Sequence, residues 1–202
     1  MTGLLGGTFD PPHNGHVTLA RTALEHFALE RLVVLVTGQT PGKPAHLSAD
    51  VRLRLAEAAF AGLPSTELSR FDVDRPQPAY THETVRWAAR EWGDVIFLVG
   101  ADRFADFLTW ERPEEVLRHA RLGVATRPGF SRPELERVLE RLEHPERVEF
   151  FEMDEVPISA REIRARVARG EPIDELVPPA VARLIEELAL YRSEGSRRAR
   201  LD

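Results

Sequence analysis

The stretch "GLLGGTFDPPHNGHVTLA", residues Gly3 to Ala20, joins an apolar run to a helical pattern through a turn that contains two histidines. Leu4 and Leu5 form the apolar run, and apolar residues recur at helical spacing from Val17 onward. A helix that follows a strand presents free backbone N–H groups and the positive end of its dipole at the turn. We therefore expect a strand, an anion-binding turn and a helix.

The same order of elements recurs along the chain. Apolar runs, several of them continuous, are expected as strands at Leu4–Leu5, Arg31–Thr37, Glu67–Asp74, Asp94–Gly100, Arg121–Thr126 and Arg147–Met153. Helical patterns lie between them: one runs from Ser48 to near Gly62, one opens at Thr81, and one follows a Ser131–Glu134 capping box. The alternation predicts an α/β fold with a doubly wound, mostly parallel sheet.

After Met153 the pattern changes to two or three helices with no strand between them. We expect a nucleotide-binding α/β domain over residues 1–154 and a C-terminal helical subdomain over residues 155–192, folded back on the sheet. The polar, Arg-rich tail over residues 193–202 is expected to be flexible.

Composition excludes several classes of protein. The 202 residues, 43% of them hydrophobic, suffice for one buried core. The net charge of -6 argues against a protein that binds a nucleic acid polymer through its overall field. The absence of cysteine excludes disulfides and cysteine nucleophiles, and neither a membrane span nor a secretory signal is visible. We expect a cytoplasmic protein, as a monomer or homo-oligomer.

The turn itself is chemically unusual. Gly6 and Gly7 would let the backbone approach a ligand, and Thr8 adds a hydroxyl. His13 and His16 can donate hydrogen bonds to phosphate oxygens, more strongly if protonated. The pattern is neither the dinucleotide-binding fingerprint nor a P-loop. The alternatives are a simple helix cap or an adventitious metal site; zinc is disfavoured because no third ligand follows at a typical spacing.

The segment "GGTFDPPHNGH" closely resembles the signature of the nucleotidylyltransferase superfamily, and the remainder resembles the nicotinate-nucleotide adenylyltransferases. The resemblance runs from Gly6 to Tyr191 and also rests on these segments: "RPQPAYTHETV", "FLVGADRFADFLTW", "ATRPG", "ISAREIR" and "GEPIDELVPPAVARLI". It implies a Rossmann-like nucleotidylyltransferase fold. The implied reaction transfers the adenylyl group of ATP to nicotinate mononucleotide.

The resemblance also implies the ATP site. The residues that it places around the ATP phosphates are Gly7, Thr8, His13, His16, Lys43, Ser159 and Arg164, while Gly100 and Asp102 meet the adenosine. His16 would donate to the transition state, His13 would hold the nucleotide phosphates, and Arg164 would clamp the β- and γ-phosphates. Magnesium is expected to be carried on the ATP phosphates, with no dedicated metal ligands in the protein and with contacts to Asp10 or Asp102 left open.

Two segments depart from the family pattern. "ISAREIR" carries Ala160 and Arg161 at its third and fourth positions, and Gly42 stands where the family often has a histidine before Lys43. Ser159 and Asp102 also have simpler interpretations, as helix-capping residues.

For the acceptor, the resemblance implies a site formed by Tyr80, Thr81 and Trp110, with Trp110 stacked on the pyridine ring and Arg127 as a further phosphate contact. The remaining histidines considered, His26, His82, His119 and His144, are expected to be structural or solvated. Two alternatives stay open: an enzyme that acts on nicotinamide mononucleotide, and a nucleotide-binding regulator without catalysis.

Overall fold

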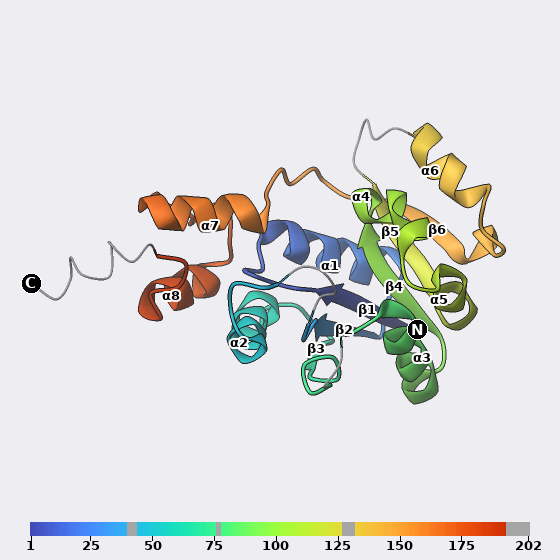
Figure 1. Cartoon of the computed structure of the whole chain (residues 1–202), viewed down its shortest axis with the longest axis horizontal. Helices are drawn as coiled ribbons and strands as arrows, with labels where there is room; N and C mark the ends of the chain where they lie inside the picture. The colour runs from blue at the N-terminus through green and yellow to red at the C-terminus, as the bar shows by residue number, and fades with distance from the viewer. Residues whose placement is uncertain (40–43, 76–77, 127–131, 193–202) are drawn as a thin grey trace, which may run out of the picture.

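The structure is a computed structural model that describes residues 1–39, 44–75, 78–126 and 132–192. Six parallel strands form one sheet in the order β3-β2-β1-β4-β5-β6 (Figure 1). Their bounds are β1 Thr2–Gly7, β2 Arg31–Val36, β3 Thr66–Ser69, β4 Val95–Gly100, β5 Arg121–Thr126 and β6 Val148–Glu152. The expected doubly wound sheet is therefore confirmed, and every pairing is parallel.

Helices cover both faces of the sheet, because its inner strands are apolar on both sides. One hydrophobic cluster joins the sheet to α1 (Asn14–His26) and α2 (Ala49–Phe60). The other joins it to α3 (Thr81–Trp92), α4 (Ala101–Ala105), α5 (Pro113–His119) and α6 (Arg132–Leu139). The short helices η1 (Phe107–Thr109) and η2 (Pro145–Arg147) complete the connections.

The strand order places a topological switch point between β1 and β4. From β1 the chain moves outward to β2 and β3, then returns to β4 on the other side and continues to β5 and β6. The register pairs Leu5 with Leu98, so the ends of β1 and β4 reach the same edge of the sheet. Open α/β sheets bind ligands at this carboxyl edge.

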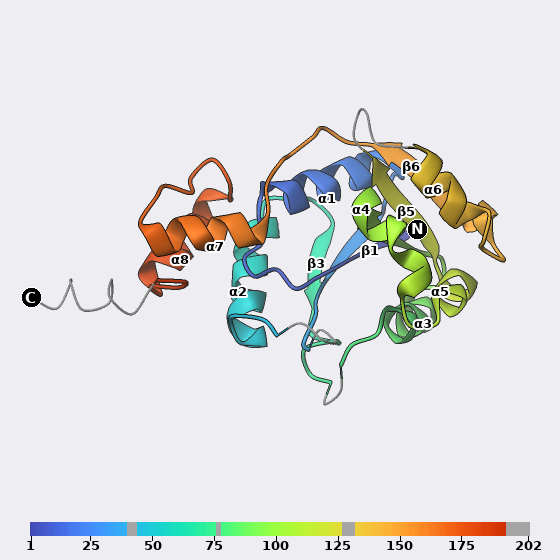
Figure 2. The same cartoon turned by 45° about the horizontal axis from the view of Figure 1, so that its top comes forward.

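Two sequence expectations need correction. The strand expected over Glu67–Asp74 ends at Ser69, because the backbone closes into a turn in which the Asp74 N–H donates to the Arg70 carbonyl oxygen at 2.9 Å. The last two helices, α7 (Ala160–Arg169) and α8 (Pro179–Glu187), do not fold back over the sheet. They lie beyond α2, at the opposite end of the molecule from α6 (Figures 1 and 2).

The C-terminal helices are held by a shared core and by backbone bonds. Ile163 of α7 and Val181 of α8 belong to the cluster that also contains α1 and α2. Asn14, at the start of α1, donates from its backbone to Leu176 and from its side chain to the carbonyl oxygen of Glu175, both at 2.9 Å. The domain boundary at residue 154 stays a prediction, since one cluster crosses it.

Candidate active site

The loop between β1 and α1 is built around Phe9. Phe9 is buried with a φ of 50°, and its ring occupies the space beside Gly7. A Cβ on Gly7 would lie 2.7 Å from that ring, and one on Gly6 would lie 2.9 Å from the ring of Phe97. Packing therefore explains why both positions lack a side chain. Close approach of their backbone to a ligand stays a prediction. The Phe9 ring in turn packs edge-on against His16 at 5.1 Å between centroids.

The two histidines lie side by side at the start of α1. His13 is the N-cap residue and His16 is the third helical residue, and their ring centroids are 3.7 Å apart. The backbone N–H of His13 donates to Nδ1 of His16 at 3.2 Å. A neutral imidazole whose Nδ1 accepts carries its proton on Nε2. The structure thus gives His16 one defined donor atom, Nε2.

Gly15 makes this pairing possible. A Cβ at residue 15 would come within 3.1 Å of Nδ1 of His13, so a larger residue would displace the ring. The same Nδ1 is buried and has no hydrogen-bond partner within the described residues. His13 therefore keeps an unused ring nitrogen beside His16.

Burial disfavours the charged form of both imidazoles. Burial lowers the pKa of His13 to about 4. Burial also lowers the pKa of His16 well below its ordinary value, and the neighbouring His13 lowers it further. Each ring can still donate one hydrogen bond when neutral. The site thus offers neutral N–H donors, and any positive charge at it must come from other residues.

Arg164 reaches this loop from a distant part of the sequence. It lies in α7, and its NH1 group donates to the backbone carbonyl oxygen of Asp10 at 2.7 Å. Ser159 is the N-cap of α7, with its hydroxyl oxygen accepting from the Glu162 N–H at 3.2 Å. The structure therefore brings Arg164 to the histidine loop and shows the capping role for Ser159, whose O–H can still donate.

Arg52, which no sequence motif singled out, is 1% exposed. Its guanidinium donates to the carbonyl oxygens of Thr8 at 2.8 Å, Thr37 at 2.6 Å and Gly38 at 2.8 Å. Those residues follow β1 and β2, so one side chain from α2 joins the two loops at the carboxyl edge. Its place on the apolar face of α2, three and four residues before Leu55 and Ala56, was the available signal.

At the end of β4, the structure leaves open space beside Gly100. Gly100 is the N-cap of α4 with a φ of -78°, and a Cβ built on it would meet nothing within 4 Å. Asp102 lies in the first turn of the same helix. Unlike Gly6 and Gly7, Gly100 has no packing reason to lack a side chain. The open space is compatible with the predicted adenosine site.

The residues predicted for the acceptor lie at the start of α3 and after η1. Tyr80 is the N-cap of α3, where no side chain caps the helix, and Thr81 is its first residue. Trp110 packs edge-on against Phe97 and Phe107, so this ring is part of the hydrophobic core. Its Nε1 is nevertheless buried without a partner within the described residues, with the Arg103 guanidinium 5.8 Å from the ring centroid.

His82, the second residue of α3, is a buried histidine. It is 5% exposed, and its Nδ1 has no hydrogen-bond partner in the described part of the chain. The expectation of a structural residue therefore holds, and a solvated ring is excluded. Nearby in sequence, Asp72 accepts from the Thr84 hydroxyl at 2.9 Å, and burial raises its pKa to about 6.

Two predicted phosphate contacts, Lys43 and Arg127, lie outside the described residues. Within the described ranges, no group of three or more histidine and acidic side chains is arranged to hold a metal ion. The same part of the chain contains no helix long and apolar enough to cross a lipid bilayer.

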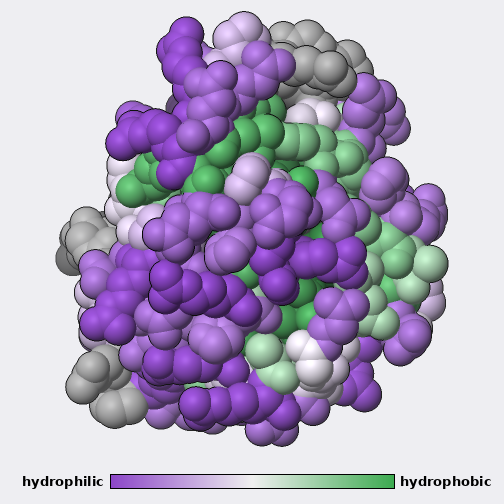
Figure 3. All heavy atoms as spheres, turned by 90° about the vertical axis from the view of Figure 1, so that its right-hand side faces the viewer, coloured by the Kyte–Doolittle hydropathy of each residue, from purple (hydrophilic) through white to green (hydrophobic). Residues whose placement is uncertain are grey.

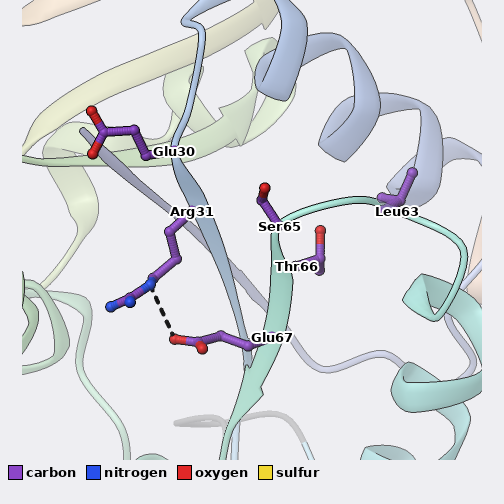
Figure 4. A pocket seen from close by; sticks show the side chains of 6 residues that line it. All are labelled: Glu30, Arg31, Leu63, Ser65, Thr66 and Glu67. Carbon is purple, nitrogen blue, oxygen red and sulfur yellow. Dashed lines mark ion pairs between the residues drawn. The ribbon is translucent and has the colours of Figure 1, made fainter.

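Two surface cavities lie away from these residues. One, of about 290 Å³, is lined by residues at the start of β2 and β3, including Arg31 and Glu67, which form an ion pair at 3.6 Å (Figure 4). The other, of about 400 Å³, lies between Ala105, Leu108 and α6. The end of the molecule that carries α6 is mostly hydrophilic, with a hydrophobic band exposed (Figure 3). Among the described residues, none that was predicted for the site lines either cavity.

Comparison with known proteins agrees with this geometry. The cytidylyltransferase-like family model matches residues 4–166. A relative from Bordetella avium, named probable nicotinate-nucleotide adenylyltransferase, is 41% identical over 195 residues, which cover 94% of this chain and 97% of the relative. A relative of the same name from Moorella thermoacetica is 36% identical over 197 residues, which cover 94% of this chain and 91% of the relative.

Among solved structures, the Plasmodium falciparum nicotinic acid mononucleotide adenylyltransferase complexed with NaAD superposes with a TM-score of 0.74. The match covers 94% of this chain and 96% of the other at 16% identity, and at that identity it shows the fold alone. The family model, which matches most of the chain, identifies it as a nucleotidyltransferase. The chain belongs to the cytidylyltransferase-like family and, within it, to the nicotinate-nucleotide adenylyltransferases.

Proposed function

We propose that the chain transfers the adenylyl group of ATP to nicotinate mononucleotide, giving nicotinate adenine dinucleotide and pyrophosphate in NAD biosynthesis. The observation that carries the proposal is the pair of adjacent histidine rings at the start of α1, beside a loop that Arg164 contacts from α7. The names of relatives that align over nearly their whole length support the same reaction.

The reaction needs positioning more than acid–base chemistry. A phosphate oxygen of the mononucleotide attacks the α-phosphorus of ATP, and the bond from that phosphorus to the oxygen bridging to the β-phosphate breaks. A phosphate monoester has its second pKa near ~6, so the nucleophile is already mostly a dianion at neutral pH. The protein must align two anions and stabilise the charge that grows on the α-phosphate and on pyrophosphate.

The donors available match those tasks. Nε2–H of His16 is free because Nδ1 accepts from the backbone, and we assign it to the α-phosphate. His13 offers its ring N–H to the nucleotide phosphates. Arg164 supplies the fixed positive charge that two neutral imidazoles lack, and the Ser159 O–H and Lys43 complete the phosphate contacts.

The start of α3 suits a carboxylate. Its first N–H groups have no side-chain cap, and the helix dipole there favours a negative group. A pyridine carboxylate gains from both effects, whereas a carboxamide gains little from the dipole. This favours nicotinate over nicotinamide mononucleotide. Trp110 would contact the pyridine ring, and its unpaired Nε1 would gain a partner.

Nucleotidyltransferases use a divalent metal with their nucleotide, and we propose Mg²⁺ carried on the ATP phosphates. Both oxygens of Asp10 already accept hydrogen bonds, from Tyr191 and from the His46 backbone, so Asp10 does not fit as a metal ligand. No step in the proposal depends on a metal contact with the protein. A cytoplasmic location and a monomeric or homo-oligomeric state stay predictions.

The test is a pyrophosphate-release assay with ATP and, in parallel, each mononucleotide. We expect turnover with nicotinate mononucleotide and a clear preference over nicotinamide mononucleotide. His16→Ala should lower kcat by about 10²–10³-fold, as expected for the loss of one transition-state donor. His26→Ala, at the exposed end of the same helix, is the control and should keep full turnover.

Two results would contradict the proposal. Near-normal turnover of His16→Ala would remove the role assigned to that ring. ATP binding without pyrophosphate release from either mononucleotide would instead favour a nucleotide-binding regulator.

A further inference from the structure

Asp10 is a buried carboxylate that connects three distant segments. It is 5% exposed and precedes His13 by three residues. Its Oδ1 accepts from the Tyr191 hydroxyl at 2.7 Å, and its Oδ2 accepts from the His46 N–H at 2.6 Å. Its backbone carbonyl oxygen accepts from Arg164. Both oxygens of the carboxylate therefore accept hydrogen bonds from other parts of the protein.

Tyr191 comes from the far end of the chain. It follows α8, has a φ of 58°, and packs on the cluster that contains α1 and α2. Burial and the hydrogen bond to Asp10 raise the pKa of Tyr191, so its hydroxyl stays protonated and donates. Because the bond joins a neutral donor to a buried charge, its loss leaves a carboxylate oxygen without a partner.

We propose that Tyr191 is a positioning residue: its hydroxyl, through the carboxylate of Asp10, holds the loop that leads into His13 and His16 and that Arg164 contacts from α7. The proposal rests on the proposed adenylyl transfer. The C-terminal segment is then part of the active-site scaffold, although it lies outside the matched family model, which ends at residue 166. Neither Tyr191 nor Asp10 needs to touch a substrate.

Tyr191→Phe tests this, because it keeps the ring and its packing and removes only the hydroxyl. We expect kcat to fall by about tenfold, the effect of losing one hydrogen bond to a charged group, with KM for both substrates within about twofold. In an Asp10→Ala background the same substitution should change kcat little further, because either change alone already removes the hydrogen bond between Tyr191 and Asp10.

A second measurement does not depend on activity. The pH titrations of His13 and His16, followed by NMR on their ring protons, report how tightly the loop is packed. In Tyr191→Phe both titrations should move toward the ordinary value near 6.5 as water reaches the rings.

The outcomes separate the two proposals. If Tyr191→Phe lowers only the free energy of unfolding, while kcat and both titrations match those of the unmodified chain, the hydroxyl is merely structural and the positioning role is wrong. If the unmodified chain releases no pyrophosphate, adenylyl transfer fails, and the titrations alone decide whether Tyr191 holds the loop.

Discussion

At the scale of single residues, the unusual property of the site is that its histidines are neutral. A phosphate-binding surface gains from positive charge, yet burial against Phe9 and against each other disfavours the charged form of both rings. The protein thereby keeps His16 in one tautomer, set by the His13 N–H. A fixed N–H donor needs no reorganisation when the transition state forms.

The low pKa of His13 predicts a pH dependence of stability. The folded chain holds the ring neutral down to about pH 4, whereas the unfolded chain protonates it near 6.5. The stabilisation is therefore complete above about pH 6.5 and is lost as the pH falls toward 4. Compared with His13→Asn, the unmodified chain should lose up to about 3 kcal/mol more in free energy of unfolding across this range.

Denaturant unfolding of the two proteins at several pH values checks this. The comparison between them is needed because Asp72, whose pKa burial raises to about 6, acts in the opposite direction: its contribution grows as the pH falls below 6. If the free energy of unfolding changes with pH in the same way in both proteins, His13 is not buried as described.

Residue identities at the site were readable from the sequence, and their chemical state was not. Two short segments that resemble the family, one with His13 and His16 and one with Ser159 and Arg164, identified these residues, and their phosphate roles stay predictions. Protonation and tautomer depend on burial and on neighbours in space, so they emerge only from the packed loop.

At the scale of elements, the junction of β4 and α4 offers the sharpest test of the ATP site. Gly100 adopts a backbone conformation open to any residue, and the space beside it is empty of protein atoms within 4 Å. A methyl group there would leave the folded chain undisturbed and would occupy space that we assign to adenosine.

Gly100→Ala should therefore leave the free energy of unfolding within about 1 kcal/mol of its original value. The KM for ATP should rise about tenfold, the effect of one methyl group that clashes in a packed complex. Gly62→Ala is the matched control, because a Cβ at Gly62 also meets nothing within 4 Å and this residue lies before β3, at the other edge of the sheet. If the KM for ATP is unchanged in Gly100→Ala, the adenosine does not bind beside Gly100.

At the scale of the whole molecule, buried polar side chains connect loops that the sequence keeps apart. Arg52 joins the loops after β1 and β2, and Asp10 joins the histidine loop to α7 and to Tyr191. The carboxyl edge is thus organised by hydrogen bonds to backbone carbonyl oxygens as well as by the sheet.

Replacing Arg52 with methionine keeps much of its volume and leaves those carbonyl oxygens without donors. The free energy of unfolding should fall by about 3–5 kcal/mol, as for the loss of one partner in a buried charged network. Arg54→Met, on the exposed face of the same helix, should change it by less than about 0.5 kcal/mol. Chemical denaturation measures both, and equal stability of the two variants would contradict the organising role of Arg52.

The sequence by itself determined the order of strands and helices and the doubly wound sheet, because both depend on periodicity along the chain. The phosphate roles of its motifs stay predictions. Only the tertiary structure decided that Arg52 is buried at the carboxyl edge, that Trp110 serves the core as well, and that the last helices lie beside α2. The physical reason is that hydrogen-bond satisfaction and burial depend on which segments meet in space. Arg164 and Asp10 are 154 residues apart and are joined by one hydrogen bond.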